Sequence, residues 1–130
     1  MKKFNAPSWL ASLALAIFFA ACDKEQAAAP PSIELIEPME GKLYEREVPI
    51  SGWVRDESLH RLKIRIAKDA DGGQVFNYSK HWHGRKEFYI EELFLPDSLS
   101  GETAFTLTIE VEDEDDLKTE KAVNFKVKPQ

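Results

Sequence analysis

Three segments of the chain alternate strictly between apolar and polar side chains, and this period of two constrains the fold more than any other feature. In residues 62–66 the even positions are aliphatic, whereas the odd positions are Lys63 and Arg65. Residues 105–111 and 123–127 repeat the pattern. Successive side chains of an extended strand point to opposite faces, so each segment predicts a β-strand with one buried face. We therefore expect an all-β protein.

Turn-forming residues divide the rest of the sequence into strands of similar length. The expected strands are residues 33–37, 47–55, 60–67, 74–79, 86–95, 103–112 and 118–127. Proline, glycine and short acidic pairs fall between or beside them. Short strands at this spacing predict a seven-strand immunoglobulin-like β-sandwich over residues 33–128.

Two positions break the alternation. Trp53 has the opposite parity from Ile50, so either Gly52 marks a β-bulge or the indole lies on the outer face of the sheet. Further along, the apolar positions change parity across residues 91–92, which predicts a second bulge there.

The amino-terminal residues have the pattern of an export signal. Lys2 and Lys3 are followed by an uncharged run over residues 9–21, which is shorter than the about 20 apolar residues needed to cross a bilayer. Two small residues then precede Cys22, and polar residues follow it. The junction at residues 19–22 resembles a bacterial lipobox. That resemblance implies cleavage of a lipoprotein signal peptide, residues 1–21, and acylation of Cys22 with diacylglycerol and palmitate-type chains.

Cys22 is the only cysteine of the chain, so it has no intramolecular disulfide partner after export. The alternative is an ordinary secretory signal with a cysteine near the cleavage point. Two or three acyl chains would anchor the protein stably to a lipid bilayer. Residues 22–32 would comprise the lipidated cysteine and a flexible tether, with two prolines at positions 30 and 31. We expect the protein to be located in the bacterial cell envelope, and we favour the outer membrane or cell surface over the inner membrane.

A resemblance to a protein group rests on four segments: residues 33–35, residues 38–41, the run Gly52-Trp53-Val54-Arg55-Asp56, and residues 101–113. They are similar to the frame of bacterial immunoglobulin-like domains of the cadherin or fibronectin kind. Within that group, the chain resembles small single-domain lipoproteins of unknown function, whose segment after the third strand is often histidine-rich. Residues 67–73 contain no histidine here, so no metal role is transferred to them. Function does not follow from the fold.

The strand order would bring all three histidines to one end of the sandwich. His81 and His83 are two residues apart, so both rings would lie on one face of an extended strand, and His60 would begin the third strand at the same end. Paired imidazoles with a third histidine or a carboxylate suit Zn²⁺ or Cu²⁺. The alternative is that these histidines are ordinary loop residues in contact with water.

The same end would hold several carboxylates. Asp56, Asp113 and Asp115 are candidate ligands for calcium, which prefers several carboxylate oxygens. The alternative is that they form acidic turns, in which aspartate accepts hydrogen bonds from local backbone amides.

The composition and the motifs of the sequence restrict the range of possible functions. A formal net charge of −6 argues against nucleic-acid binding. The sequence has no nucleophile elbow, phosphate-binding glycine loop or His-Glu-x-x-His motif, so we expect no enzyme activity. The favoured hypothesis is a membrane-anchored, non-catalytic interaction module that binds an envelope protein and needs no cofactor. The alternatives are a zinc- or copper-binding protein that uses the three histidines and a structural spacer or accessory subunit of an envelope complex.

Overall fold

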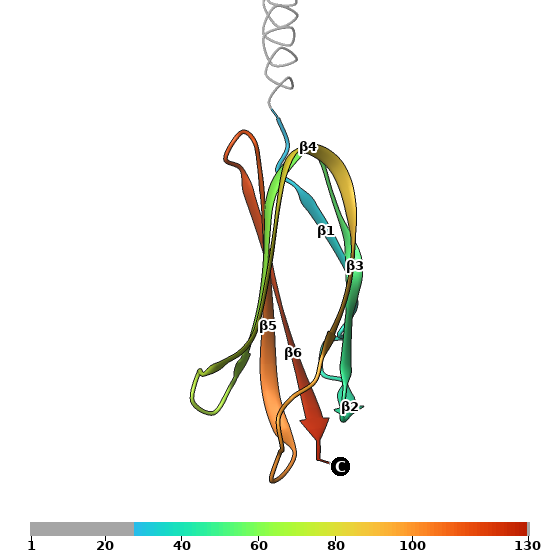
Figure 1. The fold of residues 1–130 in the computed structure, drawn as a ribbon, viewed down its shortest axis with the longest axis vertical. Coiled ribbons are helices and arrows are strands. Elements are labelled where there is room, and N and C mark those ends of the chain that lie inside the picture. Colours follow the sequence, from blue (N-terminus) through green and yellow to red (C-terminus); the bar gives the residue numbers. More distant parts are fainter. Residues whose placement is uncertain (1–27, 130) are drawn as a thin grey trace, which may run out of the picture.

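The computed structural model describes residues 28–129. Over this range the chain forms six strands and is all-β (Figure 1). The strands are β1 (Ser32–Glu37), β2 (Leu43–Glu45), β3 (Val48–Lys68), β4 (Gln74–Phe94), β5 (Thr103–Asp113) and β6 (Lys118–Lys128). The expected signal peptide, Cys22 and most of the expected tether lie outside the described residues.

Two of the strands are much longer than expected. β3 covers both segments expected at 47–55 and 60–67, and β4 covers both segments expected at 74–79 and 86–95. The expectation of seven separate strands is therefore wrong for the described part of the chain. In Figure 1 both strands curve over at the upper end of the molecule without interruption.

Two bulges, one in β3 and one in β4, explain why these strands bend and continue where strand ends were expected. The β3·β4 ladder pairs Arg55 with Glu87 and then Leu59 with Arg85, so residues 56–58 of β3 face a single residue of β4. The ladder next pairs Arg61 with His81, so residues 82–84 of β4 face one residue of β3. Extra residues on alternate strands bend a ladder strongly without terminating it.

The bends divide the sheet into two layers. Residues 48–55 of β3 pair with β1 and with the second half of β4, whereas residues 59–68 pair with β5 and with the first half of β4. β6 and then β2 extend the second layer. The expected first, second and fifth strands thus share one layer, and the expected third, sixth and seventh share the other, as in immunoglobulin-like sandwiches. The segment at 74–79 joins the second layer.

The core fills the space between the layers, and the alternating segments line it. Every even residue of 62–66 and every odd residue of 105–111 is fully buried, which confirms the predicted faces. Phe94 comes from the first layer, and its ring centroid lies 5.3 Å from that of Phe105 and 6.5 Å from that of Phe125 in the second. These contacts join the two layers directly.

Trp53 lies on the outer face of the first layer, where its ring centroid is 4.9 Å from that of Tyr89. The register from Val48 to Arg55 is unbroken, so Gly52 marks no bulge in β3. Gly52 instead allows β1 to approach, because a Cβ atom there would lie 2.4 Å from the carbonyl oxygen of Glu34.

The bulge expected at residues 91–92 is absent, and that prediction is wrong. The register of β4 against β3 continues without a shift from Phe94 to Glu87. Glu92 keeps the inward parity and is half-buried, whereas Leu93 points outward and is 48% exposed. The apolar positions change parity in the sequence because Leu93 faces outward, and the backbone register does not change.

No helix in residues 28–129 is both long and apolar enough to cross a membrane.

Candidate metal centre

One end of the sandwich collects three segments that are distant in sequence. We call it the N-terminal pole, and it consists of residues 56–60 of β3, residues 81–86 of β4 and residues 113–117 around the β5–β6 turn. The amide of Glu114 donates a 2.9 Å hydrogen bond to the carbonyl of Ser58, which ties the turn to β3. Residues 28–31 enter β1 at the same end, which is uppermost in Figure 1.

A bulge in β3 sets the direction of His60. The β3·β5 ladder pairs Leu59 with Asp113 and Arg61 with Glu112, so His60 is an extra residue between two pairs. Leu59 and Leu62 both enter the core, and the two residues between them are left on the outside. His60 is therefore held at the surface beside the β5–β6 turn.

The bulge of β4 presents the other two histidines. Trp82 points inward and is 9% exposed, and its ring centroid lies 4.9 Å from that of Phe88. His81 and His83 flank it and are exposed. Gly84, with a φ of 74°, adopts the left-handed conformation that the bend requires next to His83.

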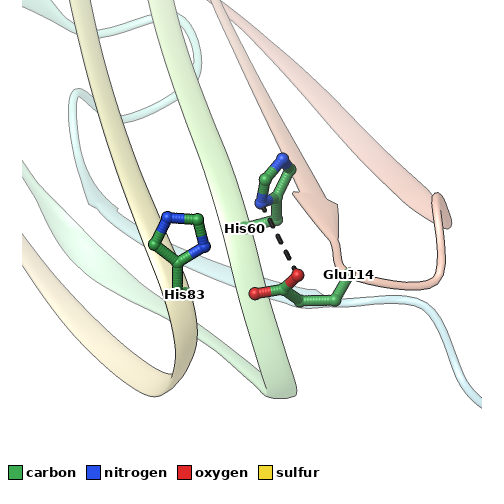
Figure 2. A group of neighbouring side chains, drawn as sticks. All are labelled: His60, His83 and Glu114. Carbon is green, nitrogen blue, oxygen red and sulfur yellow. Dashed lines mark ion pairs between the residues drawn. The ribbon is translucent and has the colours of Figure 1, made fainter.

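Three side chains converge closely enough to bind one ion. One ligand atom from each of His60, His83 and Glu114 lies within 4.8 Å of the other two. Figure 2 shows the imidazole of His83 facing His60, with the carboxylate of Glu114 below them. Nδ1 of His60 lies 3.9 Å from Oε1 of Glu114, which is longer than a hydrogen bond. This nitrogen is buried, and it has no hydrogen-bond partner among residues 28–129.

His81 lies beside this group without belonging to it. Its ring centroid is 4.5 Å from that of His60 and 5.5 Å from that of His83, and the centroids of His60 and His83 are 6.2 Å apart. The structure thus brings together all three histidines that the sequence suggested. It adds Glu114, which sequence reasoning did not select because it lies within an acidic run, residues 112–116.

The three candidate calcium ligands are arranged differently. Asp113 is 1% exposed, and its Oδ1 accepts 2.9 Å hydrogen bonds from the amides of Asp115 and Leu117. Its carboxylate therefore shapes the β5–β6 turn. Within residues 28–129, Asp56, Asp113 and Asp115 do not form a group with mutually close ligand atoms.

Asp56 lies at the same pole in an unfavourable environment for a negative charge. Burial is the largest influence and raises the pKa of its carboxyl group, and the nearby charges of Asp113, Glu57 and Asp115 act in the same direction. A 2.9 Å hydrogen bond from the amide of Ser58 opposes the shift. Carboxylates outnumber the cations Arg85 and Lys86 at this pole, which favours a bound cation over an anion.

Comparison with protein-family models and with curated proteins gives no match for this sequence. Among solved structures, it resembles part of an engineered protein, with 16% identity and a TM-score of 0.53 over 78% of this chain. It also resembles part of OgpA from Akkermansia muciniphila, with 14% identity and a TM-score of 0.53 over 76% of this chain. The aligned parts are 21% and 28% of those two chains. At these identities, the likeness concerns the fold alone.

Proposed function

We propose that this protein is an envelope lipoprotein, anchored through Cys22, whose immunoglobulin-like domain binds a transition-metal ion without catalysis. The observation that carries the proposal is the convergence of His60, His83 and Glu114 within 4.8 Å. Zn²⁺ and Cu²⁺ are the ions that best match a site of imidazole nitrogens and one carboxylate oxygen.

The distances support an ion after a small movement of the side chains. With zinc–ligand bonds of about 2.0–2.2 Å, two ligand atoms of a tetrahedral ion lie roughly 3.4 Å apart. The nitrogen of His60 and the oxygen of Glu114 are 3.9 Å apart. His83 and Glu114 are exposed and can rotate, whereas His60 is half-buried and already directed at the site.

The buried nitrogen of His60 gives an independent reason to expect a ligand. A buried polar atom without a hydrogen bond costs about 1–3 kcal/mol. A metal–nitrogen bond would satisfy it, and the other ligands lie on the same side. The carboxylate of Glu114 would also offset part of the ion's positive charge.

The proposed anchor and the metal site would lie at the same end of the domain. The hydroxyl of Thr119 donates a hydrogen bond to the carbonyl of Pro31, which fixes the start of the domain against β6. Only residues 23–30 separate this contact from Cys22, so Pro31 can lie at most about 30 Å from Cys22 when the chain is fully extended. A metal ion at the N-terminal pole would therefore be held near the membrane surface.

The test is calorimetric titration of Zn²⁺ and Cu²⁺ into the full chain in detergent, together with thermal unfolding. We expect binding of one ion at micromolar or lower concentration and a higher melting temperature, because the ion binds the folded state selectively. The double variant His60→Ala/His83→Ala should lose both effects. Equal binding by the variant, or no binding by the wild type, would refute the metal site.

A protein partner is a second candidate, supported by a different observation. β4 pairs only with β3 within the described residues, so one side of this 21-residue strand is open to solvent. The bend divides this open edge between the two layers, and the part over residues 74–81 can accept a strand from another protein. Photo-crosslinkers at Asn77 and Ser79 should capture one protein of defined mass in cells, whereas a crosslinker at Lys126 of β6 should not. Equal capture from both strands would contradict this hypothesis.

A further inference from the structure

We propose that His81 is the fourth ligand of the metal site and closes it, so that the ion is stored and cannot activate water. This inference rests on the proposed metal binding by His60, His83 and Glu114. The complete ligand set is then three imidazoles and one carboxylate, and this set determines the chemical role of the site.

The role depends on the fourth position. Two histidines and one glutamate with an open position form a ligand set found in catalytic zinc sites, where a bound water becomes nucleophilic. Four protein ligands form a closed site that holds the ion without a reactive water. His60, His83 and Glu114 alone would form the first kind, and the addition of His81 converts it to the second.

The positions of the three rings suit a single ion. Imidazole nitrogens bind zinc at about 2.0–2.1 Å, so each ring centroid lies roughly 3 Å from the ion and the centroids lie roughly 5 Å from one another. The observed separations are 4.5 Å for His60 and His81, 5.5 Å for His81 and His83, and 6.2 Å for His60 and His83. His81 is thus no farther from the other rings than they are from each other.

His81 can join the group through movement of its side chain alone. Its backbone position is fixed because it pairs with Arg61 where the β3·β4 ladder resumes after the bulge. Its side chain is exposed, so rotation about its torsions meets little packing. Rotation of the ring would direct a nitrogen toward the group without a change in the sheet.

The surroundings also argue against an open catalytic position. A cavity at the N-terminal pole is lined by residues 28–30 and by Asp56, Glu57, Asp113 and Asp115, among others. None of the three histidines lines it. A substrate in this cavity would not contact the ion, so the geometry favours retention of the metal over hydrolysis.

The test compares the full chain in detergent with His81→Ala and with Ser79→Ala. Ser79 is an exposed residue of the same strand, two positions earlier on the same face. X-ray absorption of the zinc-loaded wild type should show three imidazoles, and the His81→Ala protein should show two. Zinc affinity should fall at least about tenfold in His81→Ala, because even the loss of an outer hydrogen-bond partner of a ligand costs 10–100-fold. Ser79→Ala should match the wild type.

Cobalt gives a second measurement that does not depend on affinity. Co²⁺ in a four-coordinate site absorbs in the visible, and the position or intensity of the band should change in His81→Ala because a water oxygen replaces an imidazole nitrogen. Two imidazoles in the wild type, or equal affinities and cobalt spectra for wild type and His81→Ala, would overturn the role of His81 and leave the three-ligand site intact. Absence of zinc binding by the wild type would instead refute the proposed function itself.

Discussion

The amide of Glu114 donates a hydrogen bond of 2.9 Å to the carbonyl of Ser58, so the β5–β6 turn is attached to β3 next to His60. This bond fixes the backbone of two proposed metal ligands before any ion arrives. Binding then requires only rotation of side chains, and the loss of a ligand should affect affinity much more than folding.

The first prediction separates affinity from stability at this pole. Glu114→Gln should weaken zinc binding at least about tenfold, because it replaces a charged oxygen ligand with a neutral one, and it should change the free energy of unfolding of the metal-free protein by less than about 0.5 kcal/mol. Glu57→Gln removes the same charge from the same pole at a highly exposed site and should retain the affinity. Calorimetry and urea unfolding measure the two quantities. Equal affinity losses in both variants would indicate a general effect of charge.

The second prediction concerns the contact between β1 and β3. Gly52→Ala should destabilise the protein by about 3 kcal/mol, because the new Cβ would lie 2.4 Å from the carbonyl oxygen of Glu34 and 2.9 Å from Cα of Leu35. Neither is the end of a flexible side chain, so β1 must shift as a whole. Gly101→Ala is the control, since no atom lies within 4 Å of its added Cβ. Similar urea midpoints for the two variants would contradict the close approach.

The third prediction assigns Asp113 to the turn. Asp113→Ala removes the acceptor of two backbone amides and should lower the free energy of unfolding by about 2–3 kcal/mol. Asp113→Asn keeps an acceptor oxygen and should cost less. Both can be compared by urea unfolding with Asp115→Ala, whose side chain is exposed. Unfolding free energies of Asp113→Ala and Asp115→Ala that agree within error would refute this role.

The fourth prediction is a loss of stability in alkali. Burial is the main cause that raises the pKa of Tyr44 to about 12; its hydrogen bond to Glu37 and the charge of that carboxylate add to the shift, and the amide of Met39 opposes it. The hydroxyl of Tyr44 has its ordinary pKa of 10.0 in the unfolded chain and a pKa of about 12 in the folded protein. The contribution of Tyr44 to the free energy of unfolding is therefore complete below pH 10 and is lost as the pH rises to 12.

Tyr44→Phe tests this assignment by urea unfolding at several pH values. At neutral pH the variant should be less stable by about 1 kcal/mol, because the hydroxyl bridges Met39 and Glu37. Between pH 10 and 12 the difference should shrink. A constant difference over that range would show that Tyr44 does not cause the alkaline loss.

The alternating segments predicted the core because a strand with one buried face permits few other patterns. Ile64 and Ile109 lie opposite each other in the β3·β5 ladder, and both are fully buried as expected. The bend in β3 was mistaken for a strand end because the acidic pair Asp56-Glu57 is typical of a turn. In the structure this pair does form a local turn, in which the amide of Ser58 bonds to Asp56, but the turn is absorbed within a continuing strand.

The candidate site was predictable only in part. The spacing of His81 and His83 places two imidazoles on one face of any strand, and strand order brings His60 to the same end. Glu114 was not distinguishable from the other carboxylates near it, because long-range pairing, including the Glu114–Ser58 hydrogen bond, determines which acidic residue lies beside His60. Such a contact depends on the exact offset of two bulges, which no local pattern encodes.

The uninterrupted course of β3 and β4 has a consequence for hydrogen exchange. Each of these strands contributes to both layers, and the layers also share one buried core, so neither layer can open without exposing core residues of the other. Amides of Val54 in the first layer and Ile64 in the second should therefore exchange with solvent through one shared opening event and with similar protection factors. The two faces of the sandwich would then respond together to denaturant, heat or a ligand at the N-terminal pole.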